Sequence, residues 1–186
     1  LIVDIGGGTT EVAVISMGGI VTAHSARVAG DEMNDAIVAM FRKEFNLDIG
    51  DNTAEEVKIQ IGSAWPLAEE ITADVGGRDI ESGLPRTQAI TTNDVRAALD
   101  EPVTAIIDAI KMTLERTPPE LAADIIGQGL VLSGGGSLLA GLPERATFET
   151  GIHAYLAPEP LYSVVLGAGL TLDNIEAMRG LTAQTV

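Results

Sequence analysis

Two glycine triplets constrain this chain more than any other feature of its sequence. The first triplet (residues 6–8) follows the apolar run LIVDI, and the second (residues 134–136) follows the run LVLS. Successive glycines remove every Cβ from a turn, so the backbone can approach a bound ligand more closely than other residue types allow. The amide groups of such turns bind anions, phosphate groups among them. The sequence therefore predicts two ligand-binding turns, each at the end of a buried strand.

The first triplet is expected to join two strands. After Gly6, Gly7 and Gly8 the chain continues as TTEVAV, in which apolar residues alternate as in a half-buried strand. The turn of such a hairpin can wrap a phosphate group. Asp4 stands before the turn, where its carboxylate can hold a hydrated Mg²⁺ ion. Thr9 follows the turn and supplies a hydroxyl that can orient a water molecule. An ordinary tight hairpin with an exposed aspartate is the alternative.

The second triplet is expected to lead from a strand into a helix. Gly134, Gly135 and Gly136 are followed by Ser137, which we expect to cap a helix containing the leucines of SLLAGL. The free amides of a helix start favour an anion. A flexible loop is the alternative. Neither triplet matches a Walker A loop, which needs Lys-Ser or Lys-Thr after its last glycine. Neither matches the Rossmann fingerprint, whose spaced glycines enter a helix.

Longer segments carry a resemblance to a known superfamily. Residues 1–21 (LIVDIGGGTTEVAVISMGGIV) resemble the second phosphate motif of the actin, sugar-kinase and heat-shock-chaperone ATPases, and residues 129–142 resemble their adenosine motif. Three further segments resemble the MreB family of bacterial actin-like cell-shape proteins in particular: TAEEVKIQIGSA (53–64), RDIESGLPRT (78–87) and TPPELAADIIGQGLVLSGGG (117–136). The resemblance covers nearly the whole chain, to about residue 180.

The resemblance implies a fold and a domain organisation. The fold is an α/β actin-like ATPase domain of the ribonuclease-H-like type, with a mixed sheet, helices and an inserted smaller α+β subdomain. Residues 1–30 and 102–180 are expected to form the phosphate- and adenosine-binding subdomain, residues 31–101 the inserted subdomain, and residues 181–186 a loose tail. Because the sequence opens inside a buried-looking strand, we expect it to be the C-terminal half of such a protein.

The resemblance also implies the ligands, ATP and Mg²⁺, and the roles of site residues. Thr9 would position the attacking water and Asp4 would hold the metal, while the amides of residues 6–8 stabilise the transferring phosphoryl group. Residues 134–137 would bind the adenosine. The segment expected to flank adenine and ribose comprises Glu55, Glu56, Val57 and Lys58. Without the resemblance, Glu55 and Lys58 are typical of an exposed ion pair one helical turn apart.

Capping residues predict where several helices begin. Asp31 is expected to cap the helix that enters the inserted subdomain, with Met33, Ile37, Met40 and Phe41 on its buried face. Thr53 and Glu56 form a candidate capping box for the next helix. Pro102 suits the first position of a new helix that follows one capped by Thr92 or Asn93.

Glycine and proline predict where the remaining elements turn or end. Trp65-Pro66 is expected to end the helix that begins at Thr53. A turn at Gly76-Gly77 is expected beside a strand at residues 71–75. A helix over residues 160–172 contains Gly167 and Gly169, which we expect to allow its close approach to the sheet.

Charge and composition exclude several partners. The formal net charge of −16 argues against nucleic acid and against anionic membrane surfaces. An anionic nucleotide can still bind where backbone amides and Mg²⁺ offset its charge. The absence of cysteine excludes disulfides and thiolate metal sites. With only 3% aromatic residues, the core is expected to be mostly aliphatic.

The resemblance implies the ATP-binding half of an MreB-type cytoskeletal protein that polymerises into filaments and determines cell shape. It also implies ATP hydrolysis at full length, the cell-wall elongation machinery as partner, and a cytoplasmic location at the inner face of the cell membrane. Any membrane contact would come through the N-terminal half. Residues 1–186 alone are expected to fold, to bind ATP weakly and to be inactive in hydrolysis and filament formation, because phosphoryl transfer needs positioning from both walls of the cleft.

Two other functional classes remain open at this point. A small-molecule kinase or a chaperone-type ATPase shares both glycine turns but should lack the segments TPPELAAD and GLPRT. A non-hydrolysing filament scaffold would keep a filament surface and lose the nucleotide site. The intact Asp4, residues 6–9 and residues 134–136 argue against this scaffold.

Overall fold

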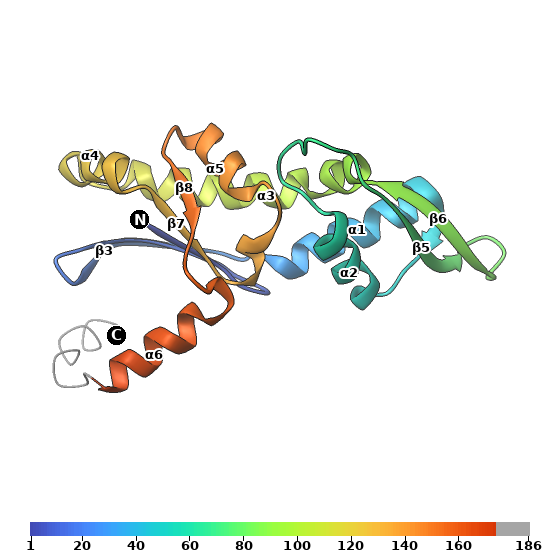
Figure 1. The fold of residues 1–186 in the computed structure, drawn as a ribbon, viewed down its shortest axis with the longest axis horizontal. Helices are drawn as coiled ribbons and strands as arrows, with labels where there is room; N and C mark the ends of the chain where they lie inside the picture. Colours follow the sequence, from blue (N-terminus) through green and yellow to red (C-terminus); the bar gives the residue numbers. More distant parts are fainter. Residues whose placement is uncertain (174–186) are drawn as a thin grey trace.

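The computed structural model describes residues 1–173, which form two sheets joined by helices (Figure 1). The larger sheet has the order β3-β2-β1-β7-β8 and the smaller one the order β4-β5-β6. The strands of the larger sheet are β1 (Ile2–Ile5), β2 (Thr10–Ser16), β3 (Gly19–Ala26), β7 (Leu130–Ser133) and β8 (Ala154–Leu156). Those of the smaller sheet are β4 (Leu47–Asp48), β5 (Thr72–Asp79) and β6 (Pro85–Thr91). The expected tail at residues 181–186 lies outside the described residues.

Six helices and two short 3₁₀ turns complete the described chain. The helices are α1 (Gly30–Phe45), α2 (Asp51–Ile61), α3 (Thr92–Glu115), α4 (Pro119–Gln128), α5 (Leu142–Thr150) and α6 (Ser163–Asp173). The 3₁₀ turns are η1 (Gly135–Leu138) and η2 (Pro160–Tyr162). Within residues 1–173, no helix combines the length and the apolar character needed to cross a membrane.

Strand β1 lies at the centre of the larger, mixed sheet. It pairs antiparallel with β2 and parallel with β7, so that Asp4 lies opposite Ser133. Val3 and Ile5 are completely buried, because β1 has neighbours on both edges and helix α3 packs against the sheet. The core is almost wholly aliphatic, as its composition predicts, with Phe41 the one aromatic among its largest fully buried side chains.

The helix starts expected from capping residues differ from those in the structure. Helix α1 has Ala29 as its N-cap, and the Ala29 amide donates to Glu32 Oε2 at 2.7 Å, so the prediction that Asp31 caps this helix is wrong. The buried face of α1 is as predicted. Helix α2 begins after Gly50, which places Thr53 inside the helix and makes the predicted capping box wrong.

Helix α3 is one continuous helix. Pro102 lies inside it, not at the start of a new helix, although proline removes one backbone hydrogen bond there. The helix is capped by Thr91, whose hydroxyl accepts from the Asp94 amide. Its apolar face is buried on both sides of Pro102, and this packing keeps the helix intact. The predicted subdomain boundary at residues 101/102 falls within α3, and the division into subdomains stays a prediction.

The structure also differs from the prediction at the end of α2 and at Gly76-Gly77. Helix α2 ends at Ile61, four residues before Trp65. Gly76 and Gly77 lie inside β5 and do not form a turn, so that prediction is wrong. A Cβ at Gly77 would lie 2.8 Å from the Asp48 carbonyl oxygen, because β4 pairs with β5 there and Asp48 lies opposite the next residue, Arg78. Glycine there serves the close approach of two strands.

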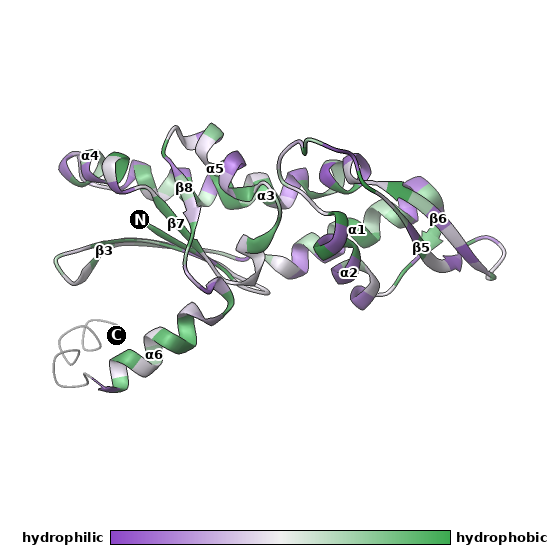
Figure 2. Cartoon of the chain, viewed as in Figure 1, coloured by the Kyte–Doolittle hydropathy of each residue, from purple (hydrophilic) through white to green (hydrophobic). Residues whose placement is uncertain are grey.

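Helix α6 points away from the sheet instead of packing on it (Figure 1). Apart from the backbone of α6 itself, no atom of residues 1–173 lies within 4 Å of a Cβ built at Gly167 or Gly169, so the predicted close approach is wrong. The helix is strongly apolar along its length (Figure 2), and Val164, Leu166 and Leu170 are more than half exposed.

The packing at β5 gives a matched pair of substitutions. Gly77→Ala should lower the free energy of unfolding by about 1–3 kcal/mol, because the new methyl group overlaps the Asp48 carbonyl oxygen and the Leu47 side chain. Gly76→Ala meets open space and should change it by less than about 1 kcal/mol, towards greater stability. Urea denaturation of both variants is the measurement, and equal effects would contradict the role given to β4.

Candidate functional site

The turn formed by the first triplet is anchored by the start of helix α1. The amides of Gly30 and Asp31 donate to the carbonyl oxygens of Gly6 (3.1 Å) and Gly7 (2.7 Å), and the Gly6 amide donates to Thr9 at 2.9 Å. The carbonyl groups of the turn therefore point at α1. Within residues 1–173, the amides of Gly7 and Gly8 have no hydrogen-bond partner, and both residues are exposed. This turn presents free donors to a ligand.

The second triplet packs directly over the end of β1. Gly134 has φ of +80°, and a Cβ there would lie 2.3 Å from the Ile5 carbonyl oxygen. A Cβ at Gly136 would lie 2.4 Å from the Ile5 side chain. Only glycine fits at both positions. Because β1 and β7 are parallel neighbours, their carboxyl ends bring the two triplets together.

Ser137 does not cap a helix. Residues Gly135–Leu138 form the 3₁₀ turn η1, and helix α5 begins only at Leu142. Ser137 is completely buried, and its hydroxyl donates to the Gly134 carbonyl oxygen at 2.7 Å. The side chain therefore holds the glycine turn in shape, which the prediction of an N-cap missed.

A cavity of about 630 Å³ lies between the two triplets, α1 and α2. One part of its lining is polar and contains Gly6, Gly7, Asp31, Glu55 and Lys58. Another part is apolar and contains Ile59, Leu138, Leu139, Ala140 and Leu161. Gly135 is exposed on this wall, and a Cβ there would meet only the end of the Leu161 side chain, at 3.2 Å.

A buried ammonium group connects the two helices at the cavity. Lys58 is only 9% exposed, and its Nζ donates to Glu55 Oε2 (2.7 Å) and to the Gly30 carbonyl oxygen (3.0 Å). Asn34 Nδ2 donates to the same Glu55 oxygen at 2.8 Å. Burial raises the pKa of Glu55, but the hydrogen bonds from Lys58 and Asn34 and the charge of Lys58 outweigh it, so the pKa lies below its ordinary value. Glu55 is therefore a carboxylate at neutral pH.

The other two residues of the predicted helical segment do not line the cavity. Val57 is 4% exposed and belongs to the hydrophobic core, and Glu56 is exposed to solvent. Helical geometry explains the difference, because residues 55 and 58 share a face that residues 56 and 57 do not.

Asp4 and Thr9 lie beside the cavity and not among its lining residues. Asp4 Oδ1 is buried and has no hydrogen-bond partner within the described chain. A buried carboxylate oxygen left unpaired is costly, and a hydrated cation would satisfy it. Residues 1–173 contain no cluster of three or more carboxylate or histidine ligands. The unpaired oxygen of Asp4 fits Mg²⁺, which keeps several of its water ligands and uses one or two carboxylates. Thr9 is exposed at the end of the turn.

Sequence reasoning missed several residues at the cavity. Gly30 and Asp31 line it because they start α1 beside the first triplet, and the Asp31 carboxylate lies 3.6 Å from the position of a Cβ on Gly7. Leu161 reaches it from the distant turn η2. The Ala29-Gly30 break was visible in the sequence, but no local pattern indicated that α1 would begin against the phosphate-type turn.

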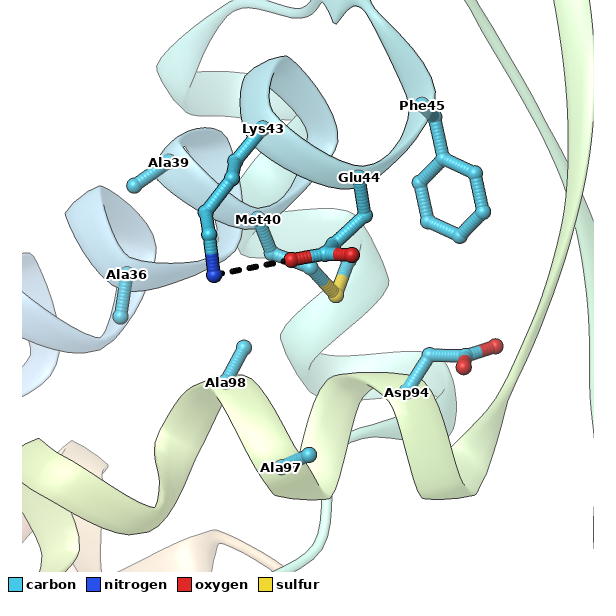
Figure 3. A pocket seen from close by; sticks show the side chains of 9 residues that line it. All are labelled: Ala36, Ala39, Met40, Lys43, Glu44, Phe45, Asp94, Ala97 and Ala98. Carbon is cyan, nitrogen blue, oxygen red and sulfur yellow. Dashed lines mark ion pairs between the residues drawn. The ribbon is translucent and has the colours of Figure 1, made fainter.

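A second hollow of about 580 Å³ lies between α1 and α3 (Figure 3). It is lined mainly by alanines and Met40, with the ion pair of Lys43 and Glu44 (3.0 Å) at its edge. No glycine turn reaches this hollow. It therefore lacks the anion-binding amides that distinguish the cavity at the triplets.

Comparisons with relatives agree with this geometry. Mbl of Bacillus subtilis (strain 168), a cell shape-determining protein, is 44% identical over 178 residues, which are 96% of this chain and 54% of that protein. MreB of Escherichia coli (strain K12), also named a cell shape-determining protein, is 44% identical over 180 residues, 97% of this chain and 52% of that protein. The chain thus spans about half the length of the curated relatives it matches.

Solved structures show the same fold. MreB5 of Spiroplasma citri bound to ADP superposes with a TM-score of 0.91 at 39% identity, over 94% of this chain and 53% of that chain. The MamK double helical filament matches with a TM-score of 0.72 at 24% identity, over 87% of this chain and 50% of that chain, which is evidence for the fold alone. The predicted α/β actin-like fold with a mixed sheet is confirmed.

The family follows from the extent of the match and not from the glycine triplets alone. The family model described as MreB/Mbl protein matches residues 1–180, nearly the whole chain. The match includes both triplets and helices α1 and α2, which together surround the cavity. The chain belongs to the MreB/Mbl family.

Proposed function

We propose that this chain is the ATP-binding half of a bacterial actin-like protein that polymerises into filaments and determines cell shape. The observation that carries the proposal is the cavity at which the free amide of Gly7, a buried lysine and an apolar wall meet. Solved structures of Spiroplasma citri MreB5 with ADP and with AMPPNP support it, as do the names of the curated relatives. The family match favours this function over a small-molecule kinase or a chaperone-type ATPase.

The polarity of the cavity suggests how the nucleotide lies in it. The amides of Gly7 and Gly8 are free donors suited to phosphate oxygens. The apolar wall formed by Ile59, Leu139 and Leu161 suits a purine base. Glu55 and Lys58 lie on the α2 side of the cavity, where they would bind the adenosine.

Hydrolysis, as we propose it, depends on residues of the first turn. Bound Mg²⁺ offsets the charge that develops on the transferring phosphoryl group. Asp4 would hold the hydrated metal through its unpaired Oδ1. Thr9, exposed at the end of the turn, would orient the attacking water, and the amides of Gly7 and Gly8 would donate to the phosphoryl oxygens.

Filament formation and cellular context extend the proposal to the protein at its natural length. Self-association into filaments follows from the resemblance to the MreB family, to which the chain belongs. Partnership with the cell-wall elongation machinery and a cytoplasmic location at the inner face of the cell membrane follow from the family resemblance. The net charge of −16 makes direct binding of nucleic acid by this half unfavourable.

The exposed glycine of the second triplet tests the binding site. Gly135→Val in the protein at its natural length should abolish ATP binding measured by calorimetry, because the isopropyl group would occupy the cavity. The fold should persist, since only the flexible end of Leu161 lies near the new side chain. Gly76→Val, in open space on β5, is the matched control and should bind ATP normally. Normal ATP affinity in Gly135→Val would remove the second triplet from the site.

The buried lysine tests the orientation of the nucleotide. Lys58→Ala should weaken ATP and ADP equally, by about tenfold or more, because a hydrogen bond from a charged group at the adenosine end serves both ligands. Gln60→Ala, on the exposed face of the same helix, should leave both affinities unchanged. Weaker binding of ATP alone would place Lys58 near the γ-phosphate and reverse the proposed orientation.

A further inference from the structure

Asn34 contacts the proposed nucleotide site through the side chain of Glu55. It lies in the second turn of α1, does not line the cavity, and donates from Nδ2 to Glu55 Oε2 at 2.8 Å. Lys58, which is on α2 like Glu55 itself, donates from Nζ to the same oxygen at 2.7 Å. Two donors from two helices therefore converge on one carboxylate oxygen, although no sequence motif includes Asn34.

The convergence restrains a side chain that would otherwise move freely. The Glu55 side chain is 45% exposed, whereas that of Lys58 is only 10% exposed. A half-exposed glutamate on a helix surface has several accessible rotamers. With Oε2 held by Asn34 and Lys58, the free oxygen Oε1 keeps a fixed direction, and no residue of the described chain donates to it.

The buried amide of Asn34 has a cost in folding free energy that packing does not explain. Asn34 Oδ1 is buried and has no hydrogen-bond partner within residues 1–173. A buried acceptor without a partner costs folding free energy, and asparagine is a poor residue for a helix interior. A leucine of similar size would avoid both penalties. Within residues 1–173, the gain that offsets this cost is the hydrogen bond of the amide to Glu55, so its effect is on Glu55.

We propose that Asn34 is a positioning residue for nucleotide binding, which acts by fixing the orientation of Glu55 and, through it, of the Lys58 ammonium group. The inference rests on the proposed function, since it specifies how that site is kept in its binding geometry. A neutral donor suits the role. It holds Glu55 without competing for the carboxylate charge that keeps Lys58 at the cavity wall.

The proposal has a consequence for the pH dependence of binding. The charged groups at this part of the cavity are Glu55 and Lys58 on α2 and Asp31 on α1. Burial raises the pKa of Glu55, and the hydrogen bonds from Lys58 and Asn34 lower it. Binding that needs ionised Glu55 is lost as the pH falls through this pKa. Loss of the Asn34 hydrogen bond raises the pKa, so the acid loss of binding should move to higher pH.

The test is a double-mutant cycle in the protein at its natural length. Asn34→Leu should weaken ATP and ADP equally, by about tenfold, the change expected for one hydrogen bond to a charged group. Its thermal stability should change little, because the loss of the hydrogen bond to Glu55 is offset by the removal of the unpaired Oδ1, and the acid limb of its ATP-binding profile should lie at higher pH. In a Glu55→Ala background, Asn34→Leu should have no further effect on affinity, because Asn34 acts through Glu55. Gln60→Leu, on the exposed face of α2, is the control and should change neither affinity nor the acid limb.

The outcomes separate this inference from the proposed function. Wild-type protein that does not bind ATP would overturn the proposed function itself. Wild-type binding with an unchanged affinity and acid limb in Asn34→Leu would overturn the role of Asn34 alone. An equal effect of Asn34→Leu with and without Glu55 would also overturn it. Should Asn34→Leu fail to fold, Asn34→Ala, which adds no volume, takes its place with the same expected results.

Discussion

Two backbone hydrogen bonds, from Gly30 to Gly6 and from Asp31 to Gly7, determine how the rest of this structure is arranged. They use the free amides at the start of α1 to bind the carbonyl groups of the glycine turn. The turn is thereby held with its remaining amides facing outward. The same two bonds join the larger sheet to the helix that enters the smaller one, so the shape of the cavity and the orientation of its donors have one cause.

A second backbone contact holds the opposite side of the cavity. The Ala64 amide donates to the Ala140 carbonyl oxygen at 2.7 Å, just after α2 and just after the second triplet. A Cβ at Gly141 would lie 2.6 Å from Trp65, so the two segments are as close as glycine permits. The cavity is therefore fixed by main-chain contacts on both sides, and side chains such as Lys58 refine it.

The electrostatics of the site depend on local donors and not on the charge of the chain. A protein of net charge −16 repels a nucleotide at long range. At the cavity, however, the free amide of Gly7 and the buried ammonium group of Lys58 are local donors, and the free amide of Gly8 lies next to them in the chain. In the proposed function, the unpaired oxygen of Asp4 would hold a cation that offsets the charge of the phosphate groups. The two carboxylates at the cavity differ in how their charge is balanced. The charge of Glu55 is neutralised by Lys58, whereas that of Asp31 is exposed to solvent.

The sequence by itself determined the strands that end in glycine triplets, the buried face of α1 and the pairing of Glu55 with Lys58, because each depends on residues close together in the chain. It also determined the aliphatic core, which follows from the composition. Only the tertiary structure decided the start of α1, the role of Gly77, the continuity of α3 through Pro102 and the burial of Ser137. At the start of α1, at Gly77 and at Pro102, a contact with a distant segment outweighed a local preference for caps, turns or breaks, whereas Ser137 is held within the 3₁₀ turn by its hydrogen bond to Gly134. Asn34 belongs to the second group, since its one partner lies twenty-one residues away on another helix.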